Sequence, residues 1–437
     1  MLWTHIAAVD TLDFKRLPLM FELFLERSGS YPMSLTIPWS DDYGHYSRTL
    51  RQMELFVRRL RTLVINGCGI AQSDFHFFSQ PAPLLEVLKI GCFPEVKTLS
   101  SLFRGFSPCL KILYLAGCAP GPTTLSHNLS TLALGPSKIE DLDNLLLMLE
   151  NSPRLEHLYL EQSLIRESYI AVLKHSIKVH YLKTLSLSGF LAEEVCALFM
   201  SLSLPQHNLA LRFVDIGSED QNFLHIYPPD FPPHLSIFTT TSLEIQFTQF
   251  LYTFYTAGHH AATAIQWCSD GPYLSALAVM RHIAQGPFSL VKELWIPLHP
   301  SGRSIPLEFP ALELLVIGRE ETLAFGFSNM LAPLEGKVPS PSIVAIKIHG
   351  HLNHIVVEEF ATALHNRANA GCWLKKLRMK RGYWEVSLLP LEHEVDELEL
   401  LDELGDRMEL PEICKTNLGE QWLSWRTDLT DHQRWFW

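Results

Sequence analysis

One segment of the chain holds histidines at a spacing that suits metal binding. His349, His351 and His354 lie two and three residues apart in the sequence His349-Gly-His-Leu-Asn-His354. Imidazole nitrogens are common zinc ligands, but no nearby Asp, Glu or Cys completes a tetrahedral set. The same residues also connect an apolar segment to a predicted helix around Val356. A metal-dependent hydrolase using residues 349–354 is therefore the most remote function that we consider, and we expect no metal and no cofactor.

The sequence contains no other recognisable catalytic pattern. The serine-hydrolase elbow, the phosphate-binding loop, the H-E-x-x-H zinc motif and the kinase motifs are all absent from it. Its 8 cysteines include no C-x-x-C pair, which disfavours a zinc ribbon or a redox motif. We therefore expect a non-enzymatic protein.

Side chains suited to protein recognition recur at alternate positions of short apolar segments. Tyrosine and tryptophan on a solvated surface often contribute ~2 kcal/mol or more each to protein binding. The alternative role is an aromatic stack between adjacent strands about 4.8 Å apart, and the sequence leaves both roles open. The candidate partner-binding residues are Tyr114, His157, Tyr159, Glu161, Trp295, Lys347 and His349.

These candidates are positioned by a repeated phrase, L-x-x-L-x-[LI]. Copies in the first half begin at Leu60, Leu85, Leu110, Leu129, Leu155 and Leu182, and later copies begin at Val291, Leu312, Ile343, Leu374 and Val395. A period in the twenties with this phrase is typical of leucine-rich repeats. The sequence therefore predicts an α/β leucine-rich-repeat solenoid, with a curved parallel sheet inside and helices outside. The candidate residues would lie on its concave face.

The regularity of this phrase suggests three regions. Residues 1–30 are an N-terminal capping region, with an amphipathic helix predicted at 11–28, and residues 31–410 are the solenoid. The solenoid is irregular at 217–290, where strands are predicted near Leu211, near Thr240 and from Ala262 to Trp267. Residues 411–437 form an aromatic cap or tail. Both one continuous array and two stacked arrays fit this pattern.

Two neighbouring copies carry opposite charges at matching positions. The basic run at residues 375–381 precedes the copy that begins at Val395, 21 residues after the one at Leu374. If the two strands are in register, Lys376 lies beside Glu397 and Arg378 beside Glu399. Such cross-strand pairs contribute roughly 0.2–1 kcal/mol each, so we expect a self-neutralised patch in place of a phosphate site.

Net charge and hydropathy restrict the partners. The formal net charge is −12, which disfavours generic binding to nucleic acid or anionic membranes. The N-terminus has no signal-peptide pattern, and no run approaches the roughly 20 apolar residues of a membrane span. We expect an intracellular protein, cytoplasmic or nuclear.

Several phrases in residues 1–190 resemble the part of mushroom-type fungal F-box proteins that follows the F-box. They include Leu2-Trp-x-x-Ile6, Pro32-Met-Ser-Leu-Thr-Ile37, Pro81-Ala-Pro-Leu-Leu-Glu-Val-Leu88 and Ser152-Pro-x-Leu-Glu-x-Leu158. The resemblance implies a substrate-binding repeat domain in a cullin-RING ubiquitin ligase, joined through an F-box to a Skp-type adaptor. Residues 17–24 are similar to the opening phrase of an F-box, but a strand is predicted within 15 residues of them, where about 40 helical residues would be needed. We therefore expect the F-box itself to be absent and adaptor binding to be doubtful.

The sequence thus predicts a protein-recognition module that holds a protein substrate or partner on its concave face. The alternative is a stand-alone repeat scaffold or decoy with no link to a ubiquitin ligase.

Overall fold

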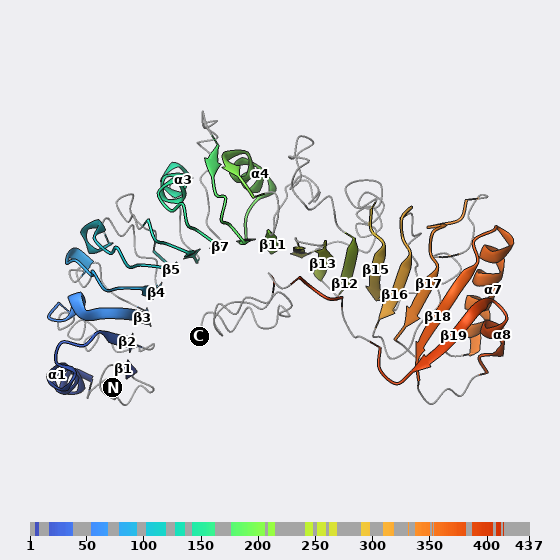
Figure 1. The fold of residues 1–437 in the computed structure, drawn as a ribbon, viewed down its shortest axis with the longest axis horizontal. Helices are drawn as coiled ribbons and strands as arrows, with labels where there is room; N and C mark the ends of the chain where they lie inside the picture. The colour runs from blue at the N-terminus through green and yellow to red at the C-terminus, as the bar shows by residue number, and fades with distance from the viewer. Residues whose placement is uncertain are drawn as a thin grey trace. The chain divides into compact units, whose positions relative to one another are not determined.

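The computed structural model forms two compact units. The first consists of Met1–Pro205 and Ile216–Pro228, and the second of Gln206–Asp215 and Pro229–Trp437. Each unit is α/β, with a large and mostly parallel sheet and few helices in its described part (Figure 1). The structure describes residues 5–7, 17–37, 54–68, 78–93, 102–118, 127–135, 142–161, 176–205, 209–214, 241–247, 251–258, 262–268, 290–297, 309–318, 331, 337–349, 352, 354–381, 387–404, 408–411 and 414.

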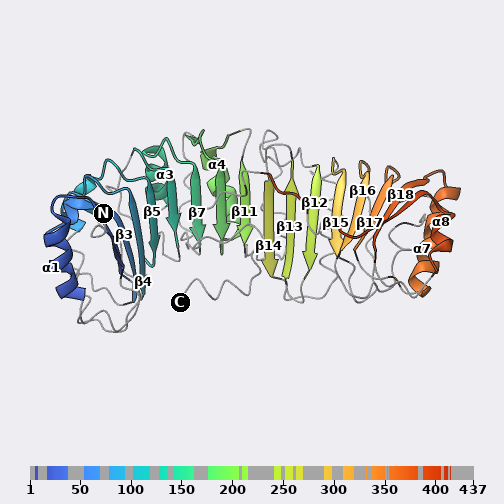
Figure 2. The same ribbon diagram turned by 60° about the horizontal axis from the view of Figure 1, so that its bottom comes forward.

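The main sheet of the first unit is parallel throughout its described strands (Figure 2). In spatial order these are β1 (His5–Ala7), β2 (Met33–Ile37), β3 (Leu60–Cys68), β4 (Val87–Phe93), β5 (Ile112–Ala116), β6 (Thr131–Leu134), β7 (His157–Glu161) and β9 (Thr184–Ser188). The other elements are α1 (Leu17–Ser28), η2 (Val57–Arg59), η4 (Leu102–Gly105), α3 (Leu142–Glu150), α4 (Ala192–Ser201) and the paired β8 (Ile177–Lys178) and β10 (Leu202–Ser203).

The repeated phrase sets the register of this sheet. Leu63 of β3 pairs with Leu88 of β4, which pairs with Leu113 of β5, and each is the fourth residue of its copy. All three side chains are 0–1% exposed. Burying a leucine contributes roughly 1.5–3 kcal/mol, and a shift of one residue would move the whole set to the opposite face. The in-register strands predicted from the phrase are therefore confirmed.

The glycine that ends one copy is required by close packing. A Cβ atom on Gly135 would lie 2.7 Å from the Cβ atom of Ala116 on the neighbouring strand, closer than real Cβ atoms approach each other. The backbone N–H of Gly135 also donates to the Leu115 carbonyl at 2.6 Å. Glycine at this position lets the chain continue the hydrogen-bond ladder as it leaves β6.

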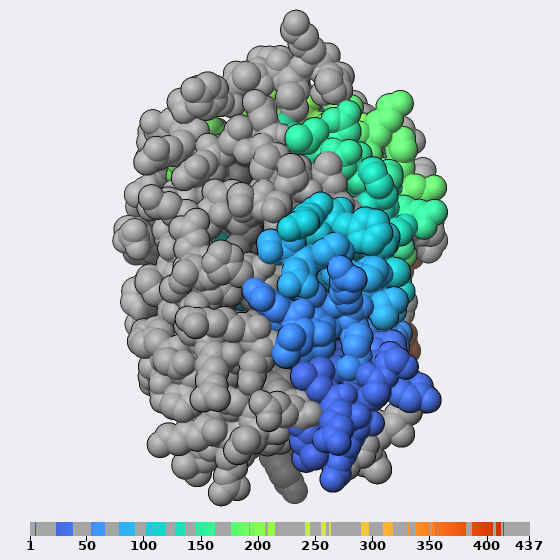
Figure 3. All heavy atoms as spheres, turned by 90° about the vertical axis from the view of Figure 1, so that its left-hand side faces the viewer, coloured from blue at the N-terminus to red at the C-terminus, as the bar shows by residue number. Residues whose placement is uncertain are grey.

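The predicted N-terminal helix is observed as α1, which begins at Leu17 and ends at Ser28. Gly29 has a φ of +54°, a left-handed conformation that favours glycine at the end of a helix. The Arg59 guanidinium holds this end in place, donating to Ser28 Oγ at 2.6 Å and to the Tyr31 carbonyl at 3.0 Å. Figure 3 shows α1 in dark blue at the edge of the surface that the following strands continue in lighter blue and cyan.

Helix α3 packs one apolar face into the core. Its residues Leu145, Leu146 and Leu149 recur at helical spacing and are buried.

The second unit has one sheet of nine strands among its described residues. In spatial order these are β11 (Ala210–Val214), β14 (Ala262–Cys268), β13 (Leu251–Ala257), β12 (Ser242–Phe247), β15 (Glu293–Pro297), β16 (Leu314–Gly318), β17 (Ala345–Ile348), β18 (Leu374–Lys380) and β19 (Val395–Leu401). Helices α7 (His354–Asn369) and α8 (Leu389–Glu392) belong to the same unit.

The irregular segment of the sequence is an antiparallel insertion. The predicted strands near Leu211, Thr240 and Ala262 are present as β11, β12 and β14, but β13 lies between β12 and β14 and is antiparallel to both. The expectation that successive strands are parallel is wrong here. Three residues separate β12 from β13 and four separate β13 from β14 in the sequence, whereas a parallel crossover needs a dozen or more, so successive strands here can pair only in the antiparallel direction.

A buried arginine fixes α7 to the segment that precedes β17. Arg367 is 0% exposed, and its guanidinium donates to the Pro339 carbonyl at 2.7 Å and to the Ser340 carbonyl at 2.6 Å. Ser340 has a φ of +43°, and its Oγ accepts a hydrogen bond from the Phe309 N–H at 2.9 Å. One side chain thus satisfies two carbonyls in a tightly bent loop.

Within the parts of the chain that the structure describes, every helix is too short or too polar to cross a membrane.

Candidate functional site

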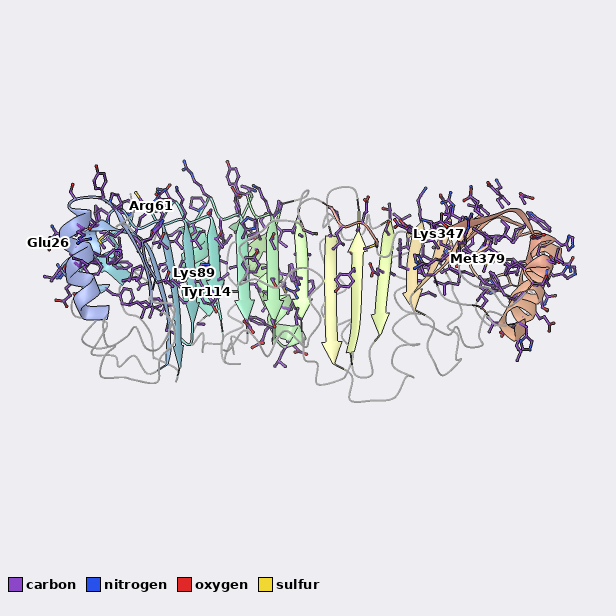
Figure 4. The ribbon with its side chains drawn as sticks, turned by 90° about the horizontal axis from the view of Figure 1, so that it is seen from below. Glu26, Arg61, Lys89, Tyr114, Lys347 and Met379 are labelled. Carbon is purple, nitrogen blue, oxygen red and sulfur yellow. The ribbon has the colours of Figure 1, made fainter. Side chains whose placement is uncertain are left out.

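In the first unit, alternate residues of successive strands form a row on the face opposite the leucines. Tyr114 pairs with Lys89 on one side and with Ala133 on the other, and Ala133 pairs with Tyr159. Figure 4 shows Lys89 and Tyr114 close together on this face. Both tyrosines are half-buried, and Ala133 between them is fully buried. Tyr114 and Tyr159 therefore present only part of their rings to solvent.

The electrostatics of this row follow from its partial burial. The pKa of Tyr114 is raised to about 12. Burial is the largest cause, and the nearby Glu161 carboxylate and Cys118 thiol add to it. Burial also lowers the pKa of Lys89 on the adjacent strand. Tyr114 accordingly stays a neutral hydroxyl over the physiological range. A neutral phenol can both donate and accept a hydrogen bond.

His157 belongs to the sheet interior more than to an exposed surface. Only 8% of it is exposed, its Nδ1 lies 3.3 Å from Thr184 Oγ1, and its Nε2 lies 4.0 Å from a Glu156 carboxylate oxygen. Burial is the main cause that lowers its pKa. Of the three candidates on β7, Tyr159 and Glu161 are half-buried and remain accessible.

The structure brings the three candidates of the second unit together. The Lys347 ammonium lies 5.9 Å from the centre of the Trp295 ring, and the His349 ring is also centred 5.9 Å from it, tilted by 36°. The indole N–H of Trp295 donates to Glu293 Oε1 at 2.9 Å. A cation over an indole ring is attracted to its electron-rich face, so the Lys347 ammonium and the Trp295 ring stabilise each other.

Trp295 is also part of an apolar cluster that sequence reasoning missed. It packs with Tyr255, Val316 and Met408 and is 8% exposed. The run of aromatic residues and threonines at 252–256 could have indicated the strand carrying Tyr255, since these residue types are enriched in strands. The sequence holds no signal for Met408, because it lies beyond the last repeat and reaches the cluster only through the tertiary fold.

Glu244 is another functional candidate that the sequence analysis did not name. It pairs with Tyr255 on one side and with Trp295 on the other, so it lies in the same row of side chains. Its side chain is 5% exposed, and one carboxylate oxygen accepts a hydrogen bond from the Met408 backbone N–H at 3.2 Å.

The predicted charge pairs between β18 and β19 are confirmed. Lys376 pairs in register with Glu397 and Arg378 with Glu399. The Lys376 ammonium is 2.8 Å from a Glu397 oxygen and also contacts Glu399, while Arg378 Nε is 2.7 Å from Glu399. These positive charges are neutralised within the sheet, as expected.

The ion pairs of Glu399 give a testable pH dependence. Hydrogen bonds from Lys376 and then from Arg378 lower the pKa of Glu399 to about 2 from its usual 4.5. Because the folded pKa is depressed, the contribution to stability is fully present above pH 4.5 and is lost as pH falls towards 2. We expect the difference in unfolding free energy between wild type and Glu399→Gln to be largest near neutral pH and to shrink through this window. Denaturant titrations at several pH values measure it, and a pH-independent difference would contradict the assignment.

The histidine segment is only partly described. His349 follows β17 with its ring against Trp295, and His354 begins α7, whereas His351 lies outside the described residues. No group of three or more His, Cys, Asp or Glu residues suited to a metal ion occurs in the described part of the chain. In the described geometry the His349 ring lies beside the Trp295 ring.

Comparisons of the chain with protein-family models, with curated proteins and with solved structures found no match in any of the three.

Proposed function

We propose that the chain is a leucine-rich-repeat solenoid that recognises protein partners on the strand face opposite its leucine core. Each copy of the phrase named above coincides with a strand, and neighbouring copies in the described strands pair in parallel register. Stacking of short repeats on their neighbours produces this arrangement. The observation that carries the proposal is the set of half-buried side chains on that face, which are Lys89, Tyr114 and Tyr159 in the first unit and Lys347 in the second.

The chemistry of these rows favours binding over catalysis. Tyr114 and Tyr159 in the first unit, and Lys347 in the second, are half-buried, so part of each side chain can contact another molecule. Partly exposed tyrosine held by its neighbours loses little conformational entropy on binding, which suits a protein interface.

The partner in this proposal is a substrate, as in the substrate-binding half of a fungal F-box protein. The order of elements supports it, since α1 leads directly into β2 at the phrase Pro32–Ile37 that carries the resemblance. Because β2 begins at Met33, the phrase at residues 17–24 is not followed by further F-box helices, and we propose no adaptor docking through it.

The test is affinity purification of the tagged chain from its native host, with mass spectrometry of what it retains. We expect Tyr159→Ala to reduce recovery of a partner of the first unit, and Lys347→Ala that of a partner of the second, about fivefold or more, because each removes a contact on the proposed face of its unit. Tyr181→Ala is the matched control for Tyr159, since Tyr181 is 64% exposed in the turn before β9. It should leave recovery unchanged.

The proteins recovered decide between the two forms of the proposal. A Skp-type adaptor with a cullin would support the ligase form, and other proteins alone would support a stand-alone scaffold. Unchanged recovery with both face variants would overturn recognition on this face.

A further inference from the structure

In the second unit, the face proposed for partner binding is already occupied by a segment of the same chain. We call the described residues Met408–Pro411 and Cys414 the strap. Met408 packs on Tyr255, Trp295 and Val316, and Cys414 packs on Ala210 and Ala262. Leu410 contacts both clusters. In Figure 1 the short red segment containing residues 408–411 lies below β12 and β13.

The register shows that the strap crosses the strands on a single face. Tyr255, Glu244, Trp295 and Val316 are successive partners across β13, β12, β15 and β16. The same row continues to Lys347 on β17. The strap therefore covers the row that contains Trp295, one of the candidate partner-binding residues.

The strap binds this face as a separate extended peptide would. Its residues 408–411 belong to no helix or strand. Met408 is 3% exposed, Glu409 points to solvent and Leu410 is half-buried, so side chains alternate between face and solvent. A long-range hydrogen bond runs from the Met408 N–H to the Glu244 carboxylate, 164 residues away in the sequence.

We propose that the strap is an internal ligand of this face, and that the partner displaces it with an extended segment of similar pattern. That segment would carry a first apolar side chain and two more at two and six residues after it, as in Met408, Leu410 and Cys414. An acidic residue would directly follow the first apolar one, as Glu409 does. A backbone N–H of the partner segment would donate to the Glu244 carboxylate in place of the Met408 N–H. This inference rests on the proposed function, because it names the partner chemistry of the same face.

The first experiment measures binding of a fluorescent peptide copying residues 406–416 to the full chain. The wild-type protein should bind it weakly, because the tethered strap competes at an effective concentration in the millimolar range. The double variant Met408→Asp, Leu410→Asp should bind it at least about tenfold more tightly. Adding Trp295→Ala to that variant should abolish binding. Equal affinity of wild type and double variant would overturn the proposal.

A second measurement needs no destabilising substitution. Cys414 is 7% exposed, and its alkylation in the wild-type protein can be followed by mass spectrometry. Excess peptide should accelerate its alkylation several-fold by displacing the strap, and should leave the buried Cys118 of the first unit unchanged. An unaltered rate at Cys414 would show that the strap is a permanent part of the core.

The two proposals fail in different ways. A partner retained equally by wild type and by the double variant would reject the strap as a competitor while leaving recognition intact. Higher recovery with the double variant supports both. Loss of peptide and partner from a double variant that remains folded would reject recognition on this face.

Discussion

Replacing Arg367 by alanine is expected to lower the unfolding free energy of the second unit by roughly 3 kcal/mol or more. The side chain is fully buried, and its loss removes one hydrogen bond from each of the Pro339 and Ser340 carbonyls and leaves a cavity beside them. The Ser340 carbonyl keeps the Ile343 N–H at 3.2 Å, so the cost comes mainly from the Pro339 carbonyl and the cavity. Each unsatisfied buried group costs about 1–3 kcal/mol. Denaturant unfolding combined with hydrogen exchange measures the loss and localises it to α7 and the loop before β17.

A second arginine in the same unit provides the control. The Arg381 side chain is 62% exposed in its ion pair with Asp402, so Arg381→Ala should change stability by less than about 0.5 kcal/mol. Arg367→Lys keeps the charge but lacks the planar fork that reaches two carbonyls, and should remain strongly destabilising. Equal stability of the Arg367→Ala and Arg381→Ala proteins would refute the role assigned to Arg367.

Replacing Phe103 by alanine is expected to cost the first unit about 3–5 kcal/mol, the range for buried aromatic side chains. Phe103 is 0% exposed, and its ring packs edge-to-face on Phe78, with centres 5.2 Å apart at 71°. The substitution removes this contact and leaves a cavity that the neighbouring backbone cannot fill. Thermal or urea unfolding of the first unit measures the effect.

The same change three residues later is the matched control. Phe106 is 54% exposed, so Phe106→Ala should have little effect on stability. If both variants lost similar stability, the backbone of this turn would be responsible in place of the Phe103 ring.

The strands of the regular repeats were predictable because local sequence determines them. Leucines at the first, fourth and sixth positions of each phrase fit only one register and one buried face. The same logic predicted the pairing of Lys376 with Glu397 and of Arg378 with Glu399. The antiparallel β13 was not predicted, because its residues do not match the phrase and its place in the sheet depends on the two short connections around it.

The candidate site was predictable only to the level of a face. Alternation along each strand correctly grouped Trp295, Lys347 and His349, which approach one another in the fold. It failed to foresee that His157 would be buried beside Thr184, or that Met408 would cover Trp295. Both outcomes depend on neighbours that are distant in sequence, and a period read along the chain carries no information about them.

The hairpin in the second unit also bears on how the protein folds. Because β13 reverses direction, β12 joins β15, and the contact from Ser242 to Glu293 spans 51 residues, against 21 for Arg378 to Glu399. Closing longer loops costs more entropy before any contact forms, which slows folding. Repeats at the C-terminal end can each pair with the strand that precedes them in the sequence. In contrast, β11 pairs with β14 and β12 with β15, so the five strands from β11 to β15 must assemble together. We expect this set to determine the folding rate of the second unit.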